Sequence, residues 1–301
     1  MRKCNKLSVS HHDYTYPPRS QRSRHEAVVC TASSSVSVQQ GASLTYGSWD
    51  DAYIVELTNH TSDPTDEGTI WFSDSGAEEK MVSYLETLDL QDVTGAEPEG
   101  NVDAENLRIL DLGTGNGHLL FALRDEGWQA QMIGVDYSER SVELARRIQE
   151  KRREDEEDED EEQTRNEDGE GEDAEVQRVT FEQYDILKDA PGPWLEEGFD
   201  IVLDKGTFDA ISLSDEVDEN GRKAFETYGS KVEPLMKVGG YFVIVSCNWT
   251  EDEVRKWFES ARLVYHDTIK FPSFTFGGVK GQTVSGVCFR RITERENASN
   301  S

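Results

Sequence analysis

A glycine-rich turn that begins with an acid is the part of this sequence that points most directly to chemistry. The segment is Asp111-Leu-Gly113-Thr-Gly115-Asn-Gly117, between a short apolar run and a helical pattern. Small residues let the backbone pass close to a ligand, and the N-terminus of the following helix offers free N–H groups. We therefore expect Asp111, Gly113, Gly115 and Gly117 to help bind a cofactor.

The spacing of the glycines separates this turn from a dinucleotide-binding turn. The dinucleotide pattern is G-x-G-x-x-G, whereas here the third glycine, Gly117, falls one residue early and His118 occupies the dinucleotide position. An acid directly before the turn, Asp111, is also unusual for nicotinamide binders. A carboxylate there favours a cofactor with a cationic amino group over one with a pyrophosphate.

Two further acids end strand-like segments in the same part of the chain. Asp136 ends an apolar run 19 residues after Gly117, and a carboxylate there can accept hydrogen bonds from both ribose hydroxyls of an adenosine. Asp185 ends the next run, where it could contact an adenine edge, and Ile186 beside it could stack on the ring. Ligands of parallel sheets bind at the carboxyl ends of strands, so these residues should meet in one crevice. The alternative is a non-binding α/β domain in which such turns are incidental.

Strand-like and helical patterns alternate from Leu107 onward. The expected strands are 107–111, 132–136, 179–185, 199–204 and 241–246, and the expected helices are 118–126, 138–148, 222–237 and 251–262. The glycine pair Gly239-Gly240 is expected to end the third of these helices. Alternation of this kind predicts βαβ units and a mostly parallel sheet.

The end of the chain departs from this alternation. Residues 263–269 and 283–290 are both strand-like, but only the Pro/Gly-rich stretch 271–282 joins them. No crossover helix fits there, and a parallel neighbour would need one. The sequence therefore predicts an α/β, Rossmann-like fold: a seven-stranded, mostly parallel sheet with a C-terminal antiparallel hairpin.

Composition divides the chain and restricts its partners. We expect an N-terminal extension over 1–43, one domain over 44–292 and a tail over 293–301. Residues Glu154–Glu175 include fifteen acids and only one arginine, which predicts a solvated loop insertion within the domain. Of the net charge of -30, about -16 lies outside this insertion. Such acidity disfavours nucleic acid and suits a basic protein partner.

Other classes of protein are disfavoured by what the sequence does not contain. It has no apolar run of ~18 residues, so no membrane span is expected. Its four cysteines form no CxxC pair and have no histidine pattern nearby, which suits a reducing compartment and predicts no metal site.

The segment after the fourth expected strand narrows the family. Asp204-Lys-Gly-Thr-Phe-Asp-Ala-Ile211 resembles the D-K-G-T-x-D-A segment of lysine methyltransferases that act on translation elongation factor 1-alpha. Tyr46–Tyr53 and Thr69–Phe72 are similar to that family's Y-W-D-x-x-Y and I-W-F segments, and Phe271–Phe276 also resembles it. Over Leu44–Ile292 the chain resembles the elongation factor 1-alpha lysine methyltransferase 2 type of protein-lysine N-methyltransferases, within the class I seven-strand S-adenosylmethionine-dependent superfamily.

This resemblance implies a function and a cofactor. It implies a cytoplasmic, monomeric enzyme that uses S-adenosyl-L-methionine to methylate a lysine of elongation factor 1-alpha, and that binds neither nucleic acid nor membrane. One departure is Val238, where the superfamily often has proline before the glycine pair. Valine there gives up a rigid turn but leaves the cofactor residues unchanged.

The resemblance also suggests residues for the substrate side. Asp204 is the candidate acid that orients the substrate amine; alternatively it holds the turn at the end of its strand. Trp49, Tyr53 and Trp249 are candidates for the wall of the substrate pocket, against the alternative of ordinary core packing.

Three other functions compete with this interpretation. A nucleic-acid amino-methyltransferase usually carries an N/D-P-P-Y/F/W segment after the fourth strand, where this chain has Asp204-Lys-Gly-Thr. A small-molecule methyltransferase would share the sheet. A non-catalytic adaptor with a role in intracellular transport would keep the cofactor motif without turnover.

Overall fold

A single seven-stranded sheet forms the centre of the protein. The computed structural model describes residues 48–90, 107–164 and 179–293, apart from 216, 219, 277 and 278. The strands of the sheet are β1 (Arg108–Leu112), β2 (Gln131–Asp136), β3 (Thr180–Gln183), β4 (Phe199–Lys205), β5 (Met236–Ser246), β6 (Leu263–Ile269) and β9 (Ser285–Arg291). Their order is β3-β2-β1-β4-β5-β9-β6.

The direction of the strands confirms the expected fold class. All neighbouring pairs from β3 to β5 are parallel, whereas β9 runs antiparallel to both β5 and β6. The last two strands therefore pair as the lack of a crossover helix predicted. The final strand lies inside the sheet, between two strands that precede it in the chain.

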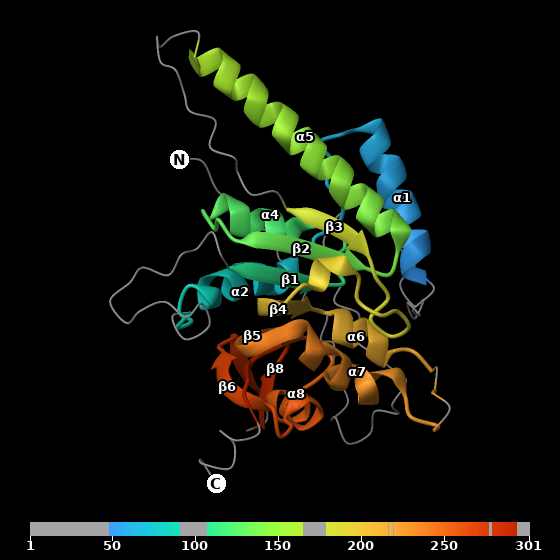
Figure 1. Cartoon of the computed structure of the whole chain (residues 1–301), viewed down its shortest axis with the longest axis vertical. Helices are drawn as coiled ribbons and strands as arrows, with labels where there is room; N and C mark the ends of the chain where they lie inside the picture. Colours follow the sequence, from blue (N-terminus) through green and yellow to red (C-terminus); the bar gives the residue numbers. More distant parts are fainter. Residues whose placement is uncertain are drawn as a thin grey trace, which may run out of the picture.

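Helices cover both faces of the sheet (Figure 1). The α-helices are α1 (Ser48–Ser62), α2 (Ala77–Leu85), α4 (His118–Asp125), α5 (Glu139–Thr164), α6 (Thr207–Ser212), α7 (Ala224–Val232) and α8 (Glu251–Phe258). Side chains of α1, α2, α4 and α5 pack in one core cluster, and side chains of α6, α7 and α8 pack in the other. No helix in the described ranges is long and apolar enough to cross a membrane.

Burial on both faces explains why the central strands are apolar without interruption. Along β1, Ile109 faces the first core cluster and Leu110 the second; along β4, Leu203 and Val202 divide in the same way. A strand covered by helices on both sides needs apolar residues at successive positions. The sequence runs read as buried strands are therefore confirmed.

The expected elements on either side of Gly239-Gly240 have different bounds in the structure. The helix expected over 222–237 is shorter, because α7 ends at Val232, a 3₁₀ turn spans Glu233–Leu235, and β5 begins at Met236. Gly239 and Gly240 lie inside β5 and do not end a helix. A Cβ on Gly240 would come within 3.0 Å of the carbonyl oxygens of Phe199 and Asp200, so glycine there serves close contact between β4 and β5.

The acidic insertion begins as a helix, so its interpretation as a loop is wrong up to Thr164. Helix α5 continues to that residue and extends away from the rest of the domain (Figure 1). Glutamate has a high helix propensity, and pairs four residues apart, Lys151–Asp155 and Arg153–Glu157, support the helix. Residues 165–175 of the insertion, the extension over 1–43 and residues 294–301 of the tail lie outside the described residues.

The connection between β6 and β9 is also more regular than expected. Within 271–282, β7 (Ser273–Phe276) and β8 (Val279–Gln282) form a separate antiparallel pair. This pair takes the place that a crossover helix would occupy in a parallel connection.

Candidate active site

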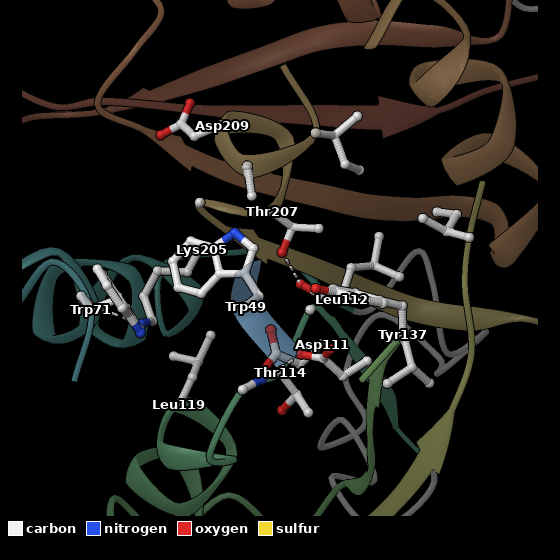
Figure 2. A pocket seen from close by; sticks show the side chains of 18 of the residues that line it. Trp49, Trp71, Asp111, Leu112, Thr114, Leu119, Tyr137, Lys205, Thr207 and Asp209 are labelled. Atoms are coloured by element: carbon white, nitrogen blue, oxygen red, sulfur yellow. Dashed lines mark hydrogen bonds between the residues drawn. The ribbon is translucent and has the colours of Figure 1, made fainter. Parts of the chain in front are cut away.

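A cavity opens at the carboxyl ends of β1, β2 and β4 (Figure 2). The glycine-rich turn after β1, the end of β2 and the start of α6 form its inner walls, and α1 together with Trp71 and Phe72 covers another side. This is the edge at which parallel sheets bind their ligands. Of the expected site residues, the cavity is lined by Asp111, Gly113, Gly115, Asp136, Ile186, Trp49 and Tyr53.

The glycine-rich turn requires glycine for its shape. Gly113, Gly115 and Gly117 have φ values of 65°, 60° and 81°, which side chains rarely adopt. A Cβ on Gly113 would lie 2.1 Å from the Thr207 hydroxyl, and one on Gly115 would lie 2.7 Å from the Tyr53 hydroxyl. Gly117 does not line the cavity itself; it forms the N-cap of α4, next to the ring of Phe181.

Asp136 lies against this turn at the end of β2. Its Oδ2 accepts a hydrogen bond from the Gly115 N–H at 3.1 Å, and its Oδ1 accepts one from the Ser138 N–H at 2.9 Å. The side chain is only 5% exposed, and burial raises its pKa. Each carboxylate oxygen retains a further lone pair for a ligand donor.

Asp111 is a second buried carboxylate on the cavity wall. It is the fourth residue of β1, directly before the turn. Burial raises the pKa of Asp111 to about 7, and the charges of Glu78 and Asp136 act in the same direction, while Lys205 opposes them. Near neutral pH this carboxyl group is therefore close to the midpoint of its titration.

Just after β3 the cavity is lined by Tyr184 and Ile186 and not by Asp185. The Asp185 Oδ1 accepts the Leu187 N–H at 2.9 Å, and its Oδ2 lies 3.2 Å from the Lys188 ammonium. These contacts hold the carboxylate in its own turn, and Asp185 does not line the cavity. The adenine contact expected for Asp185 therefore stays a prediction that its position does not favour.

Helix α1 places the aromatic side chains of Trp49 and Tyr53 at the cavity. Trp49 meets Trp71 edge to face, with ring centroids 4.7 Å apart, and the buried Trp49 Nε1 has no hydrogen-bond partner. Polar contacts hold the helix: Asp50 accepts a hydrogen bond from the Ser138 hydroxyl at 2.5 Å, Glu56 accepts one from the Thr69 N–H at 3.2 Å, and Arg147 donates one to the Thr61 hydroxyl at 2.9 Å.

Trp249 is not part of the pocket wall, so its expected role is wrong. It packs in an aromatic cluster on the other face of the sheet, with ring centroids 5.7 Å from Phe208, 5.6 Å from Phe225 and 5.8 Å from Trp257. Contact of its partly buried indole with these aromatic rings is the core packing that is the alternative for this residue.

Asp204 is likewise a structural residue and does not face the cavity. It is fully buried, and its carboxylate accepts hydrogen bonds from the Thr207 N–H at 2.8 Å, the Phe208 N–H at 3.1 Å and the Tyr228 hydroxyl at 2.8 Å. It therefore satisfies free N–H groups at the start of α6. The expected role in orienting the substrate amine is not available to a carboxylate enclosed in this way.

The acid that does line the cavity from this segment is Asp209. It lies five residues after Asp204, in α6, and is the second acid of the D-K-G-T-F-D-A segment. Its Oδ1 accepts a hydrogen bond from the Ser246 hydroxyl at 2.5 Å, and its Oδ2 accepts one from the Cys247 N–H at 2.7 Å. Only the three-dimensional direction of α6 distinguishes it from Asp204.

Lys205 is a cationic residue that was not expected at the cavity. Its ammonium donates a hydrogen bond to the Trp71 carbonyl oxygen at 3.0 Å and lies 3.8 Å from the Glu78 carboxylate. Glu78 is in turn 2.6 Å from the His118 ring at the start of α4. Alternation along β4 could have indicated that Lys205 and Asp204 point in opposite directions.

Comparison with known proteins identifies relatives over most of the chain. The family described as "Methyltransferase domain" matches residues 103–156 and 158–292. Protein-lysine N-methyltransferase EFM4 of Saccharomyces cerevisiae is 40% identical over 241 residues, which are 80% of this chain and 91% of the yeast protein. Its counterpart efm4 of Schizosaccharomyces pombe is 36% identical, again covering 80% and 91%. EEF1A lysine methyltransferase 2 of Danio rerio is 32% identical and covers 81% and 85%.

The family match extends over the whole described sheet, and the matches to the relatives cover about four fifths of the chain. The identities exceed 30% and the coverage exceeds two thirds of each chain. The chain therefore belongs to the methyltransferase-domain family and, within it, to the protein-lysine N-methyltransferases.

Proposed function

We propose that this protein uses S-adenosyl-L-methionine to methylate a lysine of translation elongation factor 1-alpha in the cytoplasm. The observation that carries the cofactor part is the cavity itself, where the glycine-rich turn, Asp111 and Asp136 meet at the carboxyl edge of the sheet. The substrate part is supported by the name of the relatives called EEF1A lysine methyltransferase 2.

The charges on the cavity wall fit this cofactor. Asp111, Asp136 and Asp209 contribute three buried carboxylates, against one lysine, Lys205. An anionic wall attracts a ligand that carries a sulfonium and an ammonium group and repels a pyrophosphate. When bound, the cofactor supplies a methyl group on a positively charged sulfur.

The lining residues have separate tasks in this proposal. The lone pairs that remain on Asp136 accept the ribose hydroxyls, and Ile186 packs on the adenine. The carboxylate of Asp111 pairs with the amino group of the cofactor. The apolar rings of Trp49, Trp71 and Phe72 exclude water from the space beside the methyl group, and a dry space lowers the pKa of an entering lysine from ~10.4.

Charge supports a basic protein as the substrate. The net charge of -30 gives a calculated isoelectric point of about 4.5, so the surface attracts a positively charged protein and repels nucleic acid. The small-molecule alternative has no such requirement for an acidic surface.

The test is methyl transfer with defined components. The purified protein is incubated with radiolabelled S-adenosylmethionine and purified elongation factor 1-alpha, and methyl-lysine is located by mass spectrometry. We expect label on one lysine of the factor and none on transfer RNA or DNA. Label on another protein, with the factor unmodified, would refute the substrate while leaving the methyltransferase assignment intact.

A further inference from the structure

We infer that Asp209 binds the ammonium group of the substrate lysine and orients its nitrogen toward the methyl donor. This inference rests on the proposed function and adds a residue that selects a lysine side chain over a neutral one. It starts from the position of Asp209 in the cavity and from the way in which its carboxylate is held.

Asp209 lies at the opposite end of the cavity from the ribose and adenine positions. Its carboxylate is fixed to the end of β5 through Ser246 and Cys247, whereas Asp136 ends β2. The order β2-β1-β4-β5 puts three strand spacings between them, or roughly 14 Å. When the nucleoside of the cofactor lies at β2 and β3, Asp209 is therefore on the far side of the methyl group, where the substrate enters.

The carboxylate is held rigidly but is not neutralised. One oxygen receives the Ser246 hydroxyl and the other receives the Cys247 N–H, and the Cys247 thiol and the Asn248 N–H also interact with the carboxylate, so its rotamer is fixed. No lysine, arginine or histidine among the described residues forms an ion pair with it. A buried carboxylate without a cation is costly, so a ligand cation is strongly favoured at this position.

The other acids of the cavity do not offer this combination. Asp111 and Asp136 adjoin the glycine-rich turn, where the cofactor is expected, and Asp204 is enclosed by Thr207, Phe208 and Tyr228. In Figure 2, Asp209 lies near the top of the view and Asp111 and Thr114 lie lower, with Trp49 between them. Asp209 is thus the carboxylate on the substrate side.

The surroundings of Asp209 suit the rest of a lysine side chain. Ala210, Cys247 and the rings of Trp49 and Phe72 line the same cavity and offer apolar surface to four methylene groups. A ring face near an ammonium adds a favourable cation–π contact. An apolar channel that ends in a fixed carboxylate is complementary to a lysine.

The geometry also defines what Asp209 does during transfer. The lysine enters as an ammonium and must lose one proton to bulk water before transfer; the carboxylate opposes this loss, whereas the dry cavity and the positive charge of the methyl donor favour it. The neutral amine remains hydrogen-bonded through an N–H to Asp209. Its lone pair then points away from the carboxylate, toward the methyl carbon.

The experiment is a double-mutant cycle between enzyme and substrate. Asp209→Asn is combined with a substrate in which the methylated lysine is changed to methionine, and binding is measured in the presence of S-adenosylhomocysteine. We expect wild-type enzyme to bind the lysine form at least about tenfold more tightly than the methionine form, and Asp209→Asn to remove most of that difference. The variant should bind S-adenosylhomocysteine normally, since asparagine can still accept the Cys247 N–H.

Asp215→Asn serves as the matched control, because Asp215 lies in the exposed segment after α6 and pairs only with Lys223 among the described residues. It should keep the preference for lysine. If Asp209→Asn also keeps it, with unchanged kcat, the inference is overturned. If wild-type enzyme leaves elongation factor 1-alpha unmodified, the proposed substrate is wrong. The same double-mutant cycle is then carried out with the protein whose lysine is labelled in cell extract, and its result tests the role of Asp209.

Discussion

Asp111, Asp136, Asp204 and Asp209 lie within one small region, and their partners give them different roles. Asp136 accepts two backbone N–H groups and still lines the cavity, whereas Asp204 accepts two N–H groups and a hydroxyl and is enclosed. Burial raises the pKa of each of these side chains, so burial alone does not separate their functions. What separates them is whether the carboxylate reaches the cavity.

At the residue scale, we expect Asp136→Ala to weaken binding of S-adenosylmethionine. Loss of a charge-assisted pair of hydrogen bonds to the ribose should cost roughly 2–3 kcal/mol, or about 30- to 150-fold in affinity. Titration calorimetry measures the change, with Asp125→Ala on the exposed side of α4 as the control. Unchanged affinity in Asp136→Ala would remove this residue from the cofactor site.

A second residue-scale prediction concerns pH. Because burial raises the pKa of Asp111 to about 7, its carboxyl group is mostly protonated at pH 6 and must lose a proton to pair with the amino group of the cofactor. Affinity for the cofactor should therefore fall as pH decreases from 7.5 to 5.5, by up to about tenfold per pH unit. Calorimetry across this range should show proton release, and Asp111→Asn should flatten the pH profile.

The stability of the unliganded protein should change in the opposite direction. A carboxyl group whose pKa is raised by folding contributes stability that is present below its unfolded pKa of ~3.9 and is lost as pH rises through about 7. The free energy of unfolding, measured with urea, should accordingly decrease between pH 5 and pH 8. In Asp111→Asn the decrease should be smaller.

At the scale of elements, α6 depends on Asp204 for its start. Asp204→Ala leaves the Thr207 and Phe208 N–H groups and the Tyr228 hydroxyl without their acceptor, so we expect a loss of about 3 kcal/mol in the free energy of unfolding. Tyr228→Phe removes one of the three hydrogen bonds and should cost about 1 kcal/mol. Urea unfolding measures both. A stable Asp204→Ala protein without activity would instead restore the amine-orienting role.

Elements whose residues must all be apolar were predictable from the sequence. The central strands are covered on both faces, and uninterrupted apolar runs such as Phe199–Leu203 reveal them directly. The role of Gly239 and Gly240 was not predictable, because a glycine pair can end a helix or admit a neighbouring strand, and only the contact with β4 decides between these. Trp249 was misassigned for a similar reason: a tryptophan after a strand suits a pocket wall or an aromatic core.

At the scale of the whole molecule, the acidic part of α5 contributes charge more than stability. We expect replacement of residues 158–175 by a short Gly/Ser bridge to change Tm by no more than about 2 °C, because Ala174 is the only apolar residue in this stretch and little apolar surface can be buried. Arg152→Ala is the contrasting control: Arg152 binds Glu67 at 2.7 and 2.8 Å and so holds α5 to the domain. A large drop in Tm for the shortened chain would show that the segment packs on the domain.

The same shortened chain tests whether the acidic segment assists a basic substrate. Attraction between exposed charges is screened by salt, so KM for elongation factor 1-alpha should rise at low ionic strength and much less at high ionic strength. The value of kcat should stay unchanged, because the cavity lies at the other end of α5. A change in kcat alone would contradict this assignment.

The position of β9 has a consequence for how the protein is made. Ribosomes synthesise a chain from its N-terminus, so β5 and β6 emerge before the strand that lies between them. Until Ser285–Arg291 follow, each presents an unpaired edge, and such edges invite pairing with other chains. The sheet is closed by its last-made strand, so the nascent chain should need protection until then. Ribosome-stalled chains that end before Ser285 should be degraded readily by protease and bind chaperones, whereas chains extended past Arg291 should resist proteolysis.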